Sequence, residues 1–139
     1  MAAFLVVDDD ESQAHTLALS LRLEGLDATA AVGPQAALAM LRVAPARVVV
    51  CDLRMKGKSG LELARELEAV HPGTKVVLTS GYPLSDAQIE RSGCQAIVGF
   101  VPKPCDLPAL VTLLRRLYSE PPAPPPSSAR MLTRPASRE

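Results

Sequence analysis

The sequence near the N-terminus reads Phe4-Leu5-Val6-Val7-Asp8-Asp9-Asp10, four apolar residues followed directly by three acids. Farther along the chain, the run Val48-Val49-Val50-Cys51 ends in the same way, at Asp52. Continuous apolar runs of this length, rich in β-branched residues, are typical of strands buried on both faces, as in a parallel sheet. The two stretches therefore predict two buried strands whose carboxyl ends carry carboxylates.

Apolar runs of this kind alternate along the chain with segments of helical spacing. The runs are Phe4–Val7, Ala28–Val32, Val48–Cys51, Val76–Leu78 and Ile97–Val101. The clearest helical stripe has apolar residues at i, i+3, i+4, i+7 and i+8, namely Leu110, Leu113, Leu114, Leu117 and Tyr118. Alternating strands and helices predict an α/β fold. Short right-handed crossovers favour a doubly wound, five-stranded parallel sheet of order 2-1-3-4-5, the flavodoxin-like arrangement.

Residues that begin or end helices fall between these runs. Ser12 is a candidate N-cap of the first helix, Pro34 marks the start of the second, and Asp106 marks the start of the last. Gly93 stands where the fourth helix is expected to stop. We expect that helix to be short and a longer loop to follow it.

The chain of 139 residues fits one domain of ordinary size. We expect this domain to occupy residues 1–119. Residues 120–139 are rich in Pro and Ser and poor in large apolar side chains. Such a composition buries too little surface to offset the entropy of ordering, which predicts a disordered tail or linker.

Composition disfavours several classes of partner. The 15 basic and 15 acidic residues cancel, whereas nucleic-acid recognition usually leaves a basic surface, so we expect no nucleic-acid partner. The N-terminal apolar run is too short to cross a membrane and ends in acids, so we expect no membrane anchor and no signal peptide. The three cysteines lack metal-type spacing, and we expect reduced thiols and a cytoplasmic location.

The acids after the first and third runs predict a binding site. In a doubly wound sheet, ligands bind beyond the carboxyl ends of the strands where the strand order reverses, here between strands one and three. Asp8, Asp9 and Asp52 are expected to converge there, and strand five ends at the same rim with Lys103. Clustered carboxylates repel one another unless a cation is present, and a few hard oxygen ligands suit Mg2+. Acids, a lysine and a hydroxyl at the end of strand four predict a phosphoacceptor site that binds Mg2+.

Over about residues 3–118, the sequence resembles the receiver domain of bacterial two-component response regulators. The segments that carry the resemblance are Phe4–Asp9, Asp52-Leu53-Arg54-Met55 with Gly60 after it, Ser80-Gly81-Tyr82 and Lys103-Pro104. The resemblance implies a regulatory switch that takes a phosphoryl group from a sensor histidine kinase. It does not imply an enzyme that acts on a separate substrate.

The resemblance also implies roles at the site. Asp52 is the phosphoacceptor and also a direct Mg2+ ligand. Asp9 and the backbone carbonyl of Arg54 complete the direct protein ligands, and Asp8 acts through water. Lys103 pairs with the phosphoryl group.

The remaining residues that match the family pattern belong to the conformational switch of receiver domains. Side chains alternate along a strand, so only one of Thr79 and Ser80 can face the crevice. The resemblance favours Ser80 as the donor to the phosphoryl group. Phe100 stands where the family has a switching aromatic residue, and the bond between Lys103 and Pro104 is expected to be cis. The output surface is expected on the fourth helix, fifth strand and fifth helix, where a downstream protein or a second copy would bind.

One residue at the site departs from the family pattern. The residue after Met55 is usually Pro in receiver domains, whereas here it is Lys56. We expect the loss of the ring to loosen the loop after strand three. The substitution also adds a cation beside the site.

Other functions fit part of the sequence. One is a receiver-like module that is never phosphorylated and serves as an interaction surface. Another is a phosphatase of the haloacid dehalogenase type, because Asp8-Asp9-Asp10-Glu11-Ser12 resembles its opening, with Asp8 as nucleophile and Asp10 as general acid. The late acidic pair and cap domain of those enzymes find no match here. A flavin-binding module is disfavoured because three acids would repel the cofactor phosphate.

Overall fold

A computed structural model describes residues 3–82 and 85–120. Within these ranges strands and helices alternate strictly. In chain order they are β1 (Phe4–Asp8), α1 (Glu11–Leu23), β2 (Ala28–Val32), α2 (Pro34–Val43), β3 (Val48–Asp52), α3 (Gly60–Val70), β4 (Lys75–Ser80), α4 (Asp86–Ser92), β5 (Ile97–Pro102) and α5 (Leu107–Ser119). This alternation confirms the predicted α/β class.

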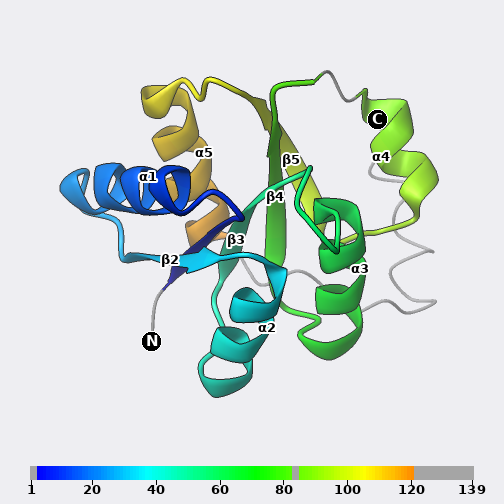
Figure 1. Cartoon of the computed structure of the whole chain (residues 1–139). Coiled ribbons are helices and arrows are strands. Elements are labelled where there is room, and N and C mark those ends of the chain that lie inside the picture. The colour runs from blue at the N-terminus through cyan, green and yellow to red at the C-terminus, as the bar shows by residue number, and fades with distance from the viewer. Residues whose placement is uncertain (1–2, 83–84, 121–139) are drawn as a thin grey trace.

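The strands form one parallel sheet of order β2-β1-β3-β4-β5, as predicted. Helices α1 and α5 cover one face of the sheet, and α2, α3 and α4 lie on the other (Figure 1). The chain leaves β1 for β2 on one side and returns to β3 on the other side. The strand order therefore reverses between β1 and β3, which is where this class of sheet binds its ligands.

The core is aliphatic and lies on both faces of the sheet. Along β1, Leu5 and Val7 pack in the cluster under α2 and α3, whereas Phe4 and Val6 pack in the cluster under α1 and α5. All four side chains are at most 3% exposed. A strand with apolar residues at successive positions thus packs against both layers of helices. For this reason the sequence shows continuous apolar runs and not an alternation of apolar and polar residues.

Three of the strands extend beyond the apolar runs into polar residues. β1 includes Asp8, β3 includes Asp52 and β4 runs to Ser80. Strand pairing continues through these positions, because Asp8 stands opposite Val32 and Asp52 opposite Thr79. The polar residues at the rim are therefore held by the sheet and not by free loops.

The start of α1 differs from the sequence-based expectation. Its N-cap is Asp10, whose side chain accepts a hydrogen bond from the amide of Gln13, and not Ser12. The amide of Asp10 itself donates to Oδ1 of Asp8 at 2.9 Å. This turn at the end of β1 lets the helix begin one residue after Asp10, so Ser12 already lies inside it.

The other predicted helix boundaries agree with the structure. α2 begins at Pro34, and the side chain of Asp106 caps α5 by accepting from the amide of Ala109. α4 is only 7 residues long and ends at Ser92, and its C-cap is Gly93, which has a φ of 72°. The left-handed backbone there explains the glycine.

The predicted tail over residues 120–139 lies, from residue 121 onward, outside the described residues. No helix among those that the structure describes is long and apolar enough to cross a membrane.

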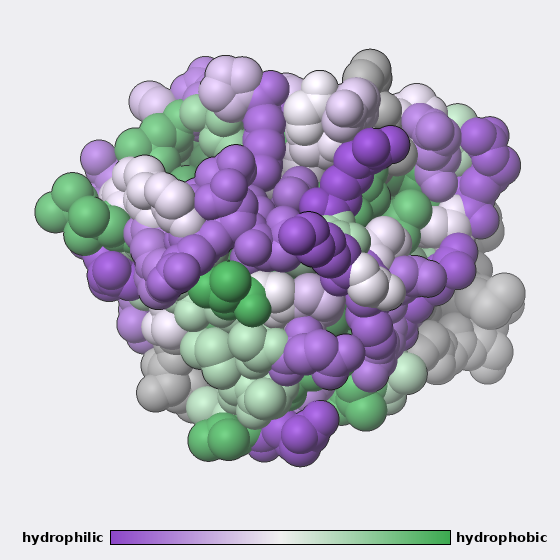
Figure 2. All heavy atoms as spheres, viewed as in Figure 1, coloured by the Kyte–Doolittle hydropathy of each residue, from purple (hydrophilic) through white to green (hydrophobic). Residues whose placement is uncertain are grey.

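On the face shown in Figure 2, hydrophilic side chains form a band between α1 and α3. Two apolar residues at helix ends are strongly exposed, namely Leu23 of α1 at 78% and Val43 of α2 at 87%.

Candidate functional site

The candidate site lies at the carboxyl ends of β1, β3 and β5. Side-chain alternation puts Asp8 in line with Val6 and Asp52 in line with Val50, so both carboxylates belong to the sheet face that α1 and α5 cover. Asp8 is 6% exposed, and the side chain of Asp52 is 13% exposed. The structure thus holds two carboxylates largely away from water at the point where the strand order reverses.

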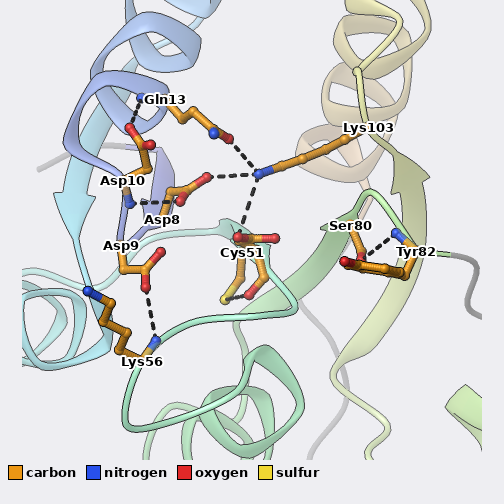
Figure 3. Close-up of polar contacts among 10 residues, drawn as sticks. Asp8, Asp9, Asp10, Gln13, Cys51, Lys56, Ser80, Tyr82 and Lys103 are labelled. Atoms are coloured by element: carbon orange, nitrogen blue, oxygen red, sulfur yellow. Dashed lines mark hydrogen bonds and ion pairs between the residues drawn. The ribbon is translucent and has the colours of Figure 1, made fainter.

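Three acids meet at this point. One ligand atom from each of Asp8, Asp9 and Asp52 lies within 4.8 Å of the others. Asp10 faces another direction, because its carboxylate caps α1 (Figure 3). Asp8, Asp9 and Asp52 thus converge as the sequence predicts, and Asp10 lies outside this cluster.

The two oxygens of Asp8 are both engaged within the protein. Oδ1 accepts from the amide of Asp10 at 2.9 Å, and Oδ2 accepts from the ammonium of Lys103 at 3.0 Å. Asp9 accepts one hydrogen bond on Oδ2, from the backbone amide of Lys56 at 2.9 Å. Asp9 and Asp52 are therefore freer than Asp8 to contact a cation directly.

The ammonium of Lys103 lies among three side-chain oxygens. It donates to Asp8 and, at 2.7 Å, to Oε1 of Gln13 in α1 (Figure 3). It also lies 3.6 Å from Oδ2 of Asp52. The last distance is too long for a hydrogen bond, so the contact with Asp52 is an ion pair. The peptide bond between Lys103 and Pro104 is cis.

Burial and charge act on these groups together. Burial raises the pKa of Asp52 above its ordinary value, the charge of Lys103 opposes this rise, and the charge of Asp8 adds to it. Burial lowers the pKa of Lys103, but its hydrogen bond to Asp8 and the nearby charges of Asp8 and Asp52 outweigh burial, so its pKa is raised overall. Lys103 therefore stays protonated. Its single positive charge does not fully neutralise the negative charge of the neighbouring carboxylates.

The donor set fits Mg2+. Mg2+ prefers hard oxygen ligands and usually binds through one or two carboxylates, waters and a phosphate. Asp9 and Asp52 supply such carboxylates in a cluster whose charge a single lysine leaves partly uncompensated. A divalent cation would relieve that repulsion.

The two hydroxyls of β4 lie on opposite sides of the strand. Thr79 follows Val77 on the face of α1 and α5, and it lines a pocket of about 630 Å³ together with Asp8 and Lys103. The hydroxyl of Ser80 accepts a hydrogen bond from the amide of Tyr82 at 3.0 Å. Alternation thus puts Thr79 on the side of Asp8 and Lys103, and the predicted role of Ser80 stays a prediction.

Phe100 and Arg54 lie farther from the acidic cluster. Phe100 of β5 stands opposite Leu78 and is partly buried against the core under α2 and α3. The guanidinium of Arg54, two residues after Asp52, lies 4.3 Å from the ring centre of Tyr82. This cation–π contact joins the loop after β3 to the loop after β4.

Gly60 is required by the packing of α3 against the end of β3. A Cβ atom at this position would lie 2.6 Å from the carbonyl oxygen of Asp52 and 3.0 Å from Cα of Leu53. The amide of Gly60 also donates to the carbonyl of Leu53 at 2.8 Å. The glycine thus lets the helix approach the strand end that carries Asp52.

Two contacts of the site were not predicted from the sequence. Gln13 was not singled out, although it lies in the first turn of α1 and accepts a hydrogen bond from Lys103. The amide of Lys56 was also missed, because a backbone donor has no residue-type signature. The only signal was the unusual residue after Met55.

Comparisons with known proteins identify the family of the chain. Residues 4–115 match the family model of the response regulator receiver domain. A response regulator receiver protein of Anaeromyxobacter sp. (strain Fw109-5) is 32% identical over 113 residues, which are 81% of this chain and 47% of that protein. The DNA-binding transcriptional regulator NtrC of Salmonella typhimurium is 32% identical over 114 residues, 82% of this chain and 24% of its own length. The chain thus spans less than half of either relative.

A solved structure of a receiver protein has the same fold. The crystal structure of a response regulator receiver protein from Pseudomonas putida superposes with a TM-score of 0.71 at 31% sequence identity. The alignment covers 81% of this chain and 94% of that one. The likeness therefore extends over nearly the whole of that crystallised chain.

Proposed function

The chain belongs to the family of response regulator receiver domains, and on this basis we propose that it is a phosphoacceptor switch of a two-component system. In this proposal Asp52 takes the phosphoryl group, a sensor histidine kinase supplies it, and Mg2+ is bound beside it. The observation that carries the proposal is the position of the Asp52 carboxylate, within one acidic cluster with Asp8 and Asp9 and 3.6 Å from the Lys103 ammonium.

The proposed reaction is a transfer between two side chains. One oxygen of Asp52 attacks the phosphorus of the kinase phosphohistidine, so a P–O bond forms while the P–N bond breaks. The electron pair leaves with the imidazole nitrogen, which takes up a proton. Such transfers depend on positioning and charge neutralisation more than on covalent help from the protein. When bound, Mg2+ would neutralise phosphoryl oxygens.

The residues around Asp52 would hold the transferred group. Asp9, Asp52 and the carbonyl of Arg54 would bind Mg2+ directly, with Asp8 acting through water. Lys103 would exchange part of its contact with Asp8 for a phosphoryl oxygen. Its raised pKa keeps the ammonium charged for this role.

The proposed response runs through β4 and β5. A phosphoryl oxygen would accept a hydrogen bond from Ser80, whose hydroxyl now accepts from Tyr82. The loop after β4 would move inward, and Phe100 would turn into the space that it leaves. The surface of α4, β5 and α5 would change as a two-state equilibrium, and a downstream protein or a second copy would bind there.

A direct test uses a small phosphodonor. The chain is incubated with acetyl phosphate in Mg2+ and, separately, in EDTA, and the intact mass is measured. We expect a gain of one phosphoryl group in Mg2+ alone. A chain that binds no Mg2+ and takes up no phosphate would instead be the receiver-like interaction module.

The phosphatase alternative has less support. It needs Asp10 as a general acid beside Asp8, but Asp10 is exposed and its carboxylate accepts from the amide of Gln13. Hydrolysis of a generic phosphate ester at a rate dependent on Asp10 would revive it.

A further inference from the structure

The backbone amide of Lys56 holds one oxygen of Asp9. The nitrogen lies 2.9 Å from Oδ2 of Asp9, across 47 residues of sequence. The side chain of Lys56 is exposed and extends away from Asp8 and Lys103 (Figure 3). The contact with Asp9 is therefore made by the main chain and not by the lysine charge.

This bond joins the two loops that frame the acidic cluster. Asp9 directly follows β1, and Lys56 lies in the loop between β3 and α3. The β3–α3 loop is also fixed at both ends, where the amide of Leu53 donates to Thr79 and the amide of Gly60 donates to Leu53, each at 2.8 Å. The bond to Asp9 anchors the middle of a loop whose ends these two bonds already hold.

We propose that the Lys56 amide is a positioning group that orients Asp9 for Mg2+. This inference rests on the proposed function, because it concerns the cation of that same site. A carboxylate has two oxygens, so the bond to Oδ2 leaves Oδ1 available to a cation. Hydrogen bonds that orient a metal-binding side chain are worth about 10–100-fold in metal affinity.

The residue type at position 56 decides whether this bond exists. Proline, the residue usual in receiver domains here, has no backbone N–H and could not make it. This chain has Lys56, whose amide compensates for the missing ring by tying the loop to Asp9. The substitution thus exchanges the rigidity of a proline ring for a hydrogen bond to Asp9.

The test compares Lys56→Pro with Lys56→Ala. Both variants remove the lysine charge, but only Pro removes the amide. Mg2+ binding is measured by titration calorimetry on the wild type and both variants. We expect the Pro variant to bind about tenfold more weakly than the Ala variant. Equal affinities would overturn the inference while leaving the proposed function intact, whereas a wild type that binds no Mg2+ would overturn both.

A metal-free measurement separates the lost bond from the stiffness that Pro introduces. Hydrogen exchange of the Lys56 amide is followed in EDTA in the wild type and in Asp9→Ala. We expect the amide to be protected in the wild type and to exchange at least about tenfold faster in Asp9→Ala, because a hydrogen bond to a charged group is among the stronger ones. Unchanged protection in Asp9→Ala would show that the amide does not act on Asp9.

Discussion

The ammonium of Lys103 donates to Oδ2 of Asp8 at 3.0 Å, whereas it lies 3.6 Å from Oδ2 of Asp52. Asp8 therefore holds the lysine more closely than the proposed phosphoacceptor does. Asp52 is largely buried beside other carboxylates, and its charge is offset by the longer ion pair with Lys103 and by a backbone hydrogen bond at Arg54. This arrangement has consequences for the stability of the metal-free protein.

Asp52→Asn is expected to stabilise the fold in the absence of Mg2+ at neutral pH. Burial and the charge of Asp8 raise the folded-state pKa of Asp52 despite Lys103, so the folded protein holds that proton more tightly than the unfolded chain. The resulting stabilisation is present below the unfolded pKa of about 3.9 and is lost as pH rises through the folded value. At pH 7 the ionised Asp52 therefore opposes folding.

Urea unfolding in EDTA from pH 4 to pH 7 measures this effect. The advantage of Asp52→Asn is expected to grow as pH rises through the range in which Asp52 ionises, and to shrink when Mg2+ stabilises the wild type. An Asn variant less stable than the wild type at pH 7 in EDTA would contradict the charge distribution described for the site.

Mg2+ affinity is expected to depend on Asp9 and not on Asp10. Asp9 belongs to the acidic cluster, whereas the carboxylate of Asp10 caps α1. Asp9→Asn should weaken binding by at least about tenfold in calorimetry. Asp10→Asn is the matched control, because Asn also caps helices well. Equal losses in the two variants would count against the proposed ligand set and in favour of the phosphatase.

Ser80→Ala is expected to remove the phosphate-dependent change of the α4–β5–α5 surface, and Thr79→Ala to retain it. Ser80 holds the amide of Tyr82, so a new partner for its hydroxyl would release the loop after β4. Hydrogen exchange with and without acetyl phosphate follows this surface. Thr79 stands opposite Asp52 and lines the pocket with Lys103. If Thr79→Ala alone abolishes the change, the switch hydroxyl belongs to Thr79.

Removal of residues 121–139 is expected to leave phosphate uptake unchanged within about twofold. The end of α5 is fixed before residue 121, because Arg47 donates to the carbonyls of Tyr118 and Glu120 and Lys75 donates to that of Leu117. The bond from Lys75 is buried, and the two from Arg47 lie at the surface. A truncated chain that no longer accepts phosphate would assign these residues a part in the site.

The fold could be predicted because the strands are buried on both faces. Each had to be a short, continuous apolar run, and the acids that end two of them marked the rim. The choice of Asp10 over Ser12 as N-cap could not be predicted, since both residue types cap well. The turn in which Asp10 donates to Asp8 decided it.

Parts of the candidate site depend on contacts that sequence patterns do not record. Gln13 meets Lys103 across 90 residues, and its position on α1 looks like that of any surface residue. The amide of Lys56 meets Asp9 across 47 residues. The acids could be predicted because they lie at strand ends. The two contacts could not, because they depend on where α1 and the β3–α3 loop lie in the folded protein.

The central claim, that Asp52 is the phosphoacceptor, is tested most directly by mass spectrometry after incubation with acetyl phosphate and Mg2+. The wild type is compared with Asp52→Ala and with Asp8→Asn, which keeps Asp52 but alters its neighbour. We expect the wild type to gain one phosphoryl group, Asp8→Asn to retain some uptake, and Asp52→Ala to gain none. A phosphoryl group on Asp52→Ala, in the same amount as on the wild type, would contradict the assignment.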